Sequence, residues 1–389
     1  MSIEGQVAIA LKVSGSAVMQ ASIASQRPLL AQSLLAGKPA NEVTDLVALV
    51  FRLCGRAQAF AASNALEAAQ MQQVSSKVLL ARYQLLRMEL IREHLWRILL
   101  DWPTLMGLDS QGDLMKQVLA FDKDWAEIWD ADNLVFKAGE HVKPVVMTKV
   151  AGLNKLCGEF LNEHVFYMPP KTFYDCQDVE QLLLWARYTQ TGAARLLQWL
   201  ISEKIAQVGD MDAFALPDLQ ENWLQEKLEG SGAEAFMQCP DIDGAAYETT
   251  PLARQKDHPL LQGLIAKFGV GLLTRYMAVL LEVSQSYVDM EKGLVPEDNN
   301  QEMRTENCAG LGVVEAARGR LIHRVILDND KVKTYQIVAP TEWNFHPNGV
   351  LQHALKSLKG DAKSLEKQAK LLIHAMDPCV KYTLEIHHA

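Results

Sequence analysis

The segment from Ala57 to Leu100 contains neither proline nor glycine, and its apolar residues recur at the spacing of an α-helix. The recurring residues are Leu79, Tyr83, Leu86, Leu90, Ile91, Leu95 and Ile98. This pattern predicts two long, adjoining helices that end at Asp101-Trp102-Pro103, because proline lacks the N–H that a helix interior needs. A chain that must bury two such helices requires a helical core.

Helical patterns also dominate most of the remaining chain. They cover residues 27–36, 41–55, 112–130, 144–163, 177–208, 259–292, 348–358 and 361–375. Asn41 and Asp361 are the expected N-caps of two of these helices, and Asp377-Pro378 should end the last one.

Two segments alternate apolar and polar residues and predict β-hairpins. One runs from Gln6 to Ala24 around Ser14-Gly15-Ser16, and the other from Leu321 to Val338 around Asp328-Asn329-Asp330. Residues 209–258 predict an irregular excursion, since they are rich in Gly, Ala and Asp. The expected fold is α+β and mainly helical, with a long-helix core and small antiparallel hairpins, in one domain spanning residues 1–389.

The composition limits the classes of partner. The net charge is -9 without basic runs, which argues against nucleic acid and against anionic lipid headgroups. The longest apolar stretch, Leu261 to Val283, contains Lys267 and Arg275, so we expect a core helix and no membrane span. The first residues lack the pattern of a secretory signal, which predicts a cytoplasmic protein.

Six cysteines are too few and too dispersed for a disulfide scaffold, and no C-x-x-C pair occurs. A buried, inert thiol is the ordinary interpretation of each. Cys54 and Cys379 stand apart, because each follows a helical pattern and adjoins Gly55 or Pro378. Backbone N–H groups at such a place lower the pKa of a thiol, and the thiolate is the form that binds metals.

Five segments, in order along the chain, resemble the large subunit of nickel-iron hydrogenases. They are Ile3-Glu4-Gly5, Arg52-Leu53-Cys54-Gly55, the stretch from Glu315 to His323, Pro340-Thr341-Glu342-Trp343-Asn344, and Asp377-Pro378-Cys379. The resemblance therefore spans residues 3 to 379.

The departures from that family concern its metal ligands. The first motif of the family is R-x-C-G-x-C followed by histidine, and Ala57 and Ala61 stand at its second cysteine and its histidine. The last motif is D-P-C-x-x-C-x-x-H, and Tyr382 and Glu385 stand at its later ligand positions. Two of the four thiolates that hold nickel in the family are absent, so we expect no nickel and no hydrogen cleavage.

The resemblance nevertheless retains the residues around the iron with its cyanide and carbon monoxide ligands. Arg318 and Thr341 match the positions that donate hydrogen bonds to cyanide, and Pro340 holds the backbone beside Thr341. Glu93 and Asp377 match acidic positions around the buried arginine, where an ion pair with Arg318 is the structural interpretation.

Other positions of the resemblance point to structural roles. Glu4 matches the proton-relay glutamate of the family, and His323 and His346 are expected to be buried, hydrogen-bonded residues rather than ligands. Trp343 and Asn344 are expected to fix the loop behind Thr341. Gln32 and Glu385 stand where the family has two ligands of a structural magnesium.

A hydrogenase-like chain with two of the four thiolates resembles the HupK/HoxV-type hydrogenase maturation proteins. The resemblance implies a non-catalytic scaffold that holds the Fe(CN)2(CO) group between Cys54 and Cys379. Its implied partners are a hydrogenase large-subunit precursor and HypC/HypD-type iron-cofactor assembly proteins. Two alternatives remain: a metal-free chaperone or degenerate subunit that binds a hydrogenase precursor, and an enzyme with a remodelled two-cysteine site that uses Glu385 or His387.

Overall fold

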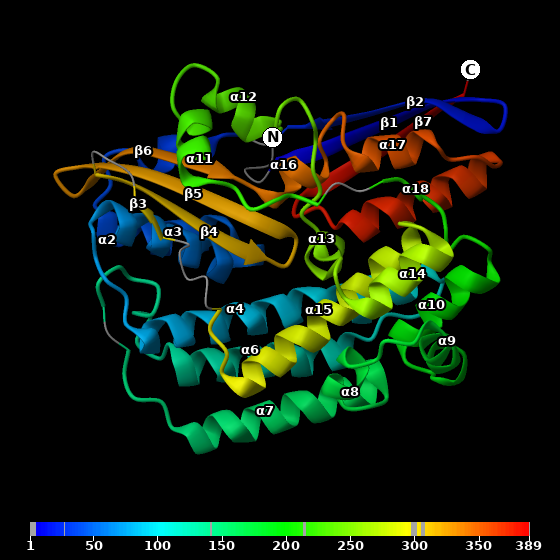
Figure 1. Cartoon of the computed structure of the whole chain (residues 1–389), viewed down its shortest axis with the longest axis horizontal. Helices are drawn as coiled ribbons and strands as arrows, with labels where there is room; N and C mark the ends of the chain where they lie inside the picture. Colours follow the sequence, from blue (N-terminus) through cyan, green and yellow to red (C-terminus); the bar gives the residue numbers. More distant parts are fainter. Residues whose placement is uncertain are drawn as a thin grey trace.

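Two small sheets and a large body of helices make up the fold (Figure 1), which confirms the predicted α+β, mainly helical class. The computed structural model describes residues 5–26, 28–140, 142–212, 215–296, 302–304 and 308–388.

The first sheet joins the two ends of the chain. It contains β1 (Gln6–Ser14), β2 (Ala17–Ser25) and β7 (Lys381–His388) in the order β2-β1-β7. The predicted first hairpin is confirmed, and Gly15 adopts a φ of 60° in its turn. The sequence did not predict β7, which pairs in parallel with β1 from Gln6 opposite Lys381 onward.

The second sheet has the order β3-β4-β5-β6 and is antiparallel throughout. Its strands are β3 (Glu302–Arg304), β4 (Ala309–Ala316), β5 (Gly319–Asp328) and β6 (Lys331–Val338). The second predicted hairpin is confirmed as β5 and β6, with Asn329 and Asp330 at φ 51° and 57° in the turn. Helix α3 lies against one face, whereas α11 and α12 lie over the other (Figure 1).

The helices take their bounds from turns and caps along the chain. From the N-terminus they are α1 (Leu30–Leu35), α2 (Ala40–Val50), α3 (Gly55–Ala69), α4 (Ser76–Trp96), α5 (Trp102–Leu105), α6 (Gly112–Trp129), α7 (Met147–Leu161), α8 (Pro170–Tyr174) and α9 (Val179–Tyr188). The others are α10 (Gly192–Ser202), α11 (Glu221–Leu228), α12 (Ala233–Gln238), α13 (Pro251–Gln255), α14 (Pro259–Phe268), α15 (Leu272–Lys292), α16 (Pro340–Asn344), α17 (Val350–Lys356) and α18 (Ala362–Met376).

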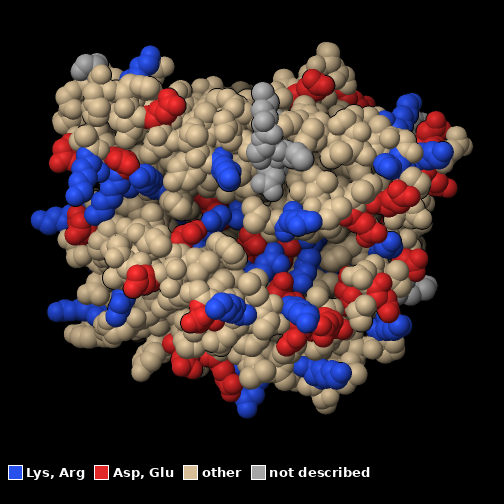
Figure 2. All heavy atoms as spheres, turned by 180° about the vertical axis from the view of Figure 1, so that it is seen from behind, with Lys and Arg blue, Asp and Glu red and all other residues tan. Residues whose placement is uncertain are grey.

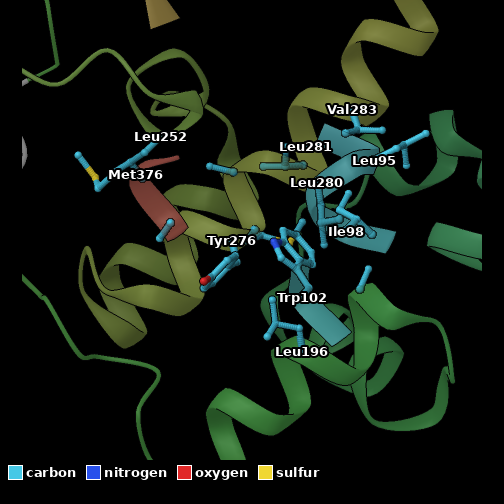
Figure 3. Packing of buried hydrophobic residues seen from close by; sticks show 14 of the residues in the cluster. Leu95, Ile98, Trp102, Leu196, Leu252, Tyr276, Leu280, Leu281, Val283 and Met376 are labelled. Atoms are coloured by element: carbon cyan, nitrogen blue, oxygen red, sulfur yellow. The ribbon is translucent and has the colours of Figure 1, made fainter. Parts of the chain in front are cut away.

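The helical core forms around α4 and α15, which pack against each other (Figure 1). Trp102 and Tyr276 meet edge to face with their ring centroids 5.1 Å apart, and Leu196 and Ile98 close around them (Figure 3). Because aromatic side chains bury large apolar areas, this cluster stabilises the position of α15 relative to α5 and α10. The predicted long-helix core is therefore confirmed.

Four local predictions differ from the structure. Asn41 lies inside α2, whose N-cap is Pro39, because the N–H of Ala40 donates to the carbonyl of Asp330 instead of to a side chain. The helix of α4 continues through a π-helical turn into α5, where Pro103 occupies the first turn and its missing N–H costs little.

The stretch from Leu261 to Val283 is two helices, not one, because Gly269 turns the chain with a φ of 69°. The expected irregular excursion at residues 209–258 contains three short helices, α11, α12 and α13. Leu224 and Phe236 from two of them pack against the second sheet, and helices this short leave little periodicity in the sequence.

Among the described residues, no helix by itself has the length and apolar character needed to cross a membrane. Helix α2 and the segment Arg52–Ala69 reach these limits only when taken together, and they are bent by 106° relative to each other.

Candidate metal centre

Cys54 lies at the junction between two helices. It ends a 3-10 turn, Arg52–Cys54, that follows α2, and it is the N-cap residue of α3. The Nε2 of Gln58, one turn further on, lies 3.6 Å from its Sγ. The first free N–H groups of α3, those of Arg56 and Ala57, donate to the Glu89 carboxylate at 2.8 and 2.9 Å.

Cys379 lies at the other end of the chain, between α18 and β7. Asp377 ends α18 with a left-handed φ of 49°, which turns the backbone toward the first sheet. The Oγ1 of Thr341 lies 2.8 Å from the Cys379 Sγ. Pro340 occupies the first position of α16, where its fixed φ suits a helix start and sets the place of Thr341.

The two thiols interact with each other and with one arginine. Burial, followed by the charges of Glu89 and Cys379, raises the pKa of Cys54 to about 12, although Arg318 and the hydrogen bond from Gln58 act in the opposite direction. The expectation that backbone N–H groups lower this pKa is wrong, because the Glu89 carboxylate accepts those N–H groups and adds its own negative charge. At this pKa the thiol of Cys54 is protonated at neutral pH.

Arg318 lies at the tip of the hairpin between β4 and β5, in the two-residue turn Ala317-Arg318. Its side chain is buried, and its Nη1 and Nε lie 3.1 and 3.3 Å from carboxylate oxygens of Glu93 and Asp377. Burial lowers the pKa of Arg318, but these two carboxylates outweigh it and raise the pKa above its ordinary value. The predicted ion pairs with Glu93 and Asp377 are confirmed.

The Nε of Arg318 has no hydrogen-bond acceptor of good geometry among the described residues, although Asp377 is near. The side chain thus keeps a buried donor that its ion pairs do not fully use.

Further charged side chains pair with the two carboxylates that hold Arg318. Arg97 pairs with Asp377 at 2.6 Å, and Arg92 pairs with Glu93 at 2.8 Å and with Asp122 at 2.9 Å. Acidic and basic side chains lie close together near the middle of the face seen in Figure 2, which carries both signs throughout. A cavity of about 20 Å³, near the volume of one water molecule, borders Arg318, Arg97 and Asp377.

The residues that replace the family's ligands lie in other surroundings. Ala57 and Ala61 are fully buried in an apolar cluster with Val314 and Leu321. The Tyr382 hydroxyl lies 3.4 Å from His374, on α18. Glu385 and His387 are exposed on β7 and pair with each other at 3.3 Å.

The structural interpretations made from the sequence agree with the contacts. His323 is buried between Gln58 and Tyr335, and His346 accepts from the N–H of Asn348. Asn344 donates to the carbonyl of Arg318 at 2.8 Å.

The side-chain amide of Gln32 is hydrogen-bonded to β6: it donates to the carbonyl of Lys333 and accepts from the N–H of Tyr335. Glu4 lies outside the described residues.

The sequence did not single out Glu89, Gln58 or Arg97. Gln58 was detectable, because it follows Cys54 by four residues on a helix. Glu89 precedes Glu93 by the same spacing on α4, which places both carboxylates on one face. Within the part of the chain that the structure describes, no group of three or more His, Cys, Asp or Glu residues is arranged to hold a metal ion.

Known proteins resemble this chain over nearly its whole length. Residues 270–383 match the model of the nickel-dependent hydrogenase family. The hydrogenase expression/formation protein HoxV of Cupriavidus necator is 27% identical over 93% of this chain and 92% of its own. The chain is a homologue of the HoxV/HupK hydrogenase expression/formation proteins. HupK of Azotobacter vinelandii is likewise 27% identical, over 99% of each chain.

The fold of this chain also occurs in solved hydrogenases. The [NiFeSe] hydrogenase of Dm. baculatum superposes with a TM-score of 0.66 over 94% of both chains at 15% identity. The Ni-Fe-Se hydrogenase of D. vulgaris Hildenborough gives a TM-score of 0.65 over 94% of both chains at 16% identity. The resemblance to nickel-iron hydrogenase large subunits and HupK/HoxV-type proteins, which the five sequence segments indicated, is confirmed.

Proposed function

We propose that this chain acts in hydrogenase maturation as a non-catalytic scaffold that carries an Fe(CN)2(CO) group between Cys54 and Cys379. The observation that carries the proposal is that the residues expected to neighbour the iron group lie around Cys379: the Thr341 Oγ1 lies 2.8 Å from its Sγ, and buried Arg318 pairs with Asp377, two residues before it. The pKa of Cys54, which burial raises, also responds to both Cys379 and Arg318, which is in keeping with this arrangement. The names of the HoxV and HupK relatives, which are hydrogenase expression/formation proteins, support the same role.

The side chains around the thiols suit this cargo. Cyanide on iron carries negative charge and accepts hydrogen bonds at nitrogen, and charge-assisted hydrogen bonds of this kind contribute about 1.5 to 3 kcal/mol each. The buried Nε of Arg318 is a donor without a full partner, and the hydroxyl of Thr341 lies beside Cys379. Arg318, Thr341 and Pro340 would therefore orient the diatomic ligands, while Glu93 and Asp377 hold Arg318 in place.

Two thiolates also suit a carrier better than a permanent site. Fewer bonds have to break when the iron group leaves, and the high pKa of Cys54 favours return of its proton at that moment. In this proposal HypC/HypD-type proteins supply the iron group and a hydrogenase large-subunit precursor receives it, in the cytoplasm.

The test is infrared spectroscopy and iron analysis of the protein purified without oxygen from a host with the assembly proteins. We expect cyanide and carbonyl stretching bands and iron at a substantial fraction of one per chain. Cys54→Ala and Cys379→Ala should both lose the bands. Cys157→Ala is the matched control, because Cys157 is buried on α7 with a pKa that burial likewise raises to about 12.

A metal-free chaperone that binds a hydrogenase precursor is the second candidate. The observation in its favour is the raised pKa of Cys54, which keeps this thiol in the protonated form that does not bind metals. Wild-type protein without iron or infrared bands, with Cys54→Ala still active in maturation, would establish this alternative. An enzyme with Glu385 or His387 as a ligand receives no support from their exposed mutual ion pair.

A further inference from the structure

Arg254 lies on α13, within the segment that the sequence indicated as irregular, and contacts the turn that carries Arg318. Its Nη2 donates to the carbonyl of Ala317 at 3.0 Å, and its Nη1 donates to the carbonyl of Thr249 at 2.8 Å. Its Nε and Nη2 also hold the Glu282 carboxylate at 2.5 and 2.7 Å. Since the Nη1 also reaches Glu315 at 3.5 Å, the guanidinium makes five polar contacts.

Glu282 connects Arg254 to the partner of Arg318. It lies on α15 and its second contact is the Nε2 of His94 at 2.6 Å. His94 follows Glu93 on α4, and Glu93 pairs with Arg318. The contacts therefore form a closed path from the backbone of the turn through α13, α15 and α4 to the side chain of Arg318.

The backbone of the turn is confined on its other side as well. The N–H of Arg320 donates to the Oγ1 of Thr249 at 2.8 Å, and Asn344 holds the carbonyl of Arg318. A Cβ at Gly319, which has a φ of 129°, would lie 2.2 Å from the carbonyl oxygen of Thr249. The segment Thr249–Arg254 and the turn thus fit so closely that a shift of one displaces the other.

We infer that Arg254, with Glu282 and His94, is a positioning residue that sets the direction of the Arg318 guanidinium toward the cargo of Cys54 and Cys379. Arg254 fixes the backbone on which Arg318 is placed, and His94 fixes the helix turn on which Glu93 is placed. This inference rests on the proposed function, since it concerns the donor to the iron-bound cyanide. It adds the region around α13, for which the sequence indicated no role.

The test compares Arg254→Lys with Arg324→Lys in protein purified with its iron group. Arg324 is a matched control, because it is an arginine on β5, the strand that follows the Arg318 turn, and its buried side chain contacts Glu229 and Gln336 rather than the turn. Lysine keeps the charge at both positions but has a single nitrogen, which cannot hold Glu282 and both backbone carbonyls together.

We expect Arg254→Lys to shift the cyanide bands and to speed the loss of iron by about tenfold, as supporting residues behind metal ligands do. Arg324→Lys should leave the bands in place even if its thermal melting temperature falls by the same amount. Unchanged bands and iron loss in folded Arg254→Lys would overturn the inference. If Arg254→Lys does not fold, Glu282→Gln, which keeps shape and removes charge, is measured against the same control with the same two outcomes.

A double variant separates positioning through Arg318 from a direct effect. In an Arg318→Leu background, Arg254→Lys should cause no further loss of iron, because the residue that it positions is gone. A full additional loss would show that Arg254 acts by another route and would overturn the inference. Wild-type protein without iron or bands would instead overturn the proposed function, so the two failures are distinguishable.

Discussion

At the scale of single residues, the ion pairs of Arg318 explain how a charged donor can be buried beside two thiols. Removing a guanidinium from water is costly unless carboxylates and hydrogen bonds compensate it. Glu93 and Asp377 supply this compensation, and each has a second arginine, Arg92 and Arg97 respectively. Loss of Arg318 would therefore leave neither carboxylate without a cation, and a variant at this position should remain folded.

Arg318→Leu and Thr341→Val should weaken cargo binding to different extents. The first substitution removes a charged donor and should weaken binding of the iron group by about 2 kcal/mol. The second removes a neutral hydroxyl and should weaken binding by about 1 kcal/mol. Iron content after gel filtration shows which substitution causes the larger loss of iron. The cyanide bands should shift in both variants. Thermal melting of the iron-free variants is the control, and unchanged iron and bands in both folded variants would mean that neither side chain contacts the cargo.

At the scale of elements, the second sheet lies directly on α3 because β4 presents glycines to it. A Cβ at Gly310 would lie 2.1 Å from the carbonyl oxygen of Ala65, and one at Gly312 would lie 2.0 Å from that of Ala61. These distances are far below van der Waals contact, so the backbones approach as closely as glycine permits. The alanines of α3, including Ala57 and Ala61, continue this close packing up to Cys54.

Gly312→Ala should destabilise the protein, because the added methyl group pushes β4 away from α3. We expect a decrease of about 1 to 3 kcal/mol in the free energy of unfolding, measured by urea denaturation. Gly152→Ala on α7 is the control, since a Cβ there meets open space and alanine favours a helix. Equal stabilities for the two variants would contradict the close approach of β4 and α3.

Glu282 on α15 contacts Arg254 on α13 and His94 on α4. This carboxylate should make the free energy of unfolding depend on pH. Burial opposes its ionisation, but Arg254 and His94 outweigh it and hold its pKa at about 2. Because this pKa is below that of the unfolded chain, the carboxylate stabilises the fold above about pH 4.5. The contribution, about 3 kcal/mol, is lost as the pH falls toward 2.

Glu282→Gln tests this dependence. The variant should be less stable than the wild type at pH 7, and the difference between the two should shrink as the pH falls from 4.5 toward 2. Urea denaturation at several pH values measures it. A difference that stays constant over this range would show that folding does not lower the pKa of Glu282.

At the scale of the whole molecule, the sequence predicted the hairpins and long helices because their periodicity is local. It did not predict β4, whose glycines interrupt the pattern, or β7, whose parallel partner β1 is at the other end of the chain. The resemblance located Cys54, Cys379 and Arg318, and the structure added the contacts among them. The pKa of Cys54 was predicted in the wrong direction, because burial of the thiol and the position of Glu89 both depend on how the helices pack, which the sequence does not show.

The protein as a whole should also bind iron in preference to nickel. The resemblance to the nickel-iron hydrogenase large subunit implies four thiolates around nickel, and Ala57 and Tyr382 stand at two of these positions here. Ala57 lies among apolar side chains and Tyr382 lies against His374, so neither provides a substitute ligand. Since soft metal sites depend on the number and geometry of their thiolates, the remaining pair should not retain nickel.

Metal analysis of anaerobically purified protein should find iron and almost no nickel, and hydrogen oxidation assays should give no turnover. Stoichiometric nickel or measurable turnover would instead favour an enzyme, and Cys54→Ala would then have to abolish both.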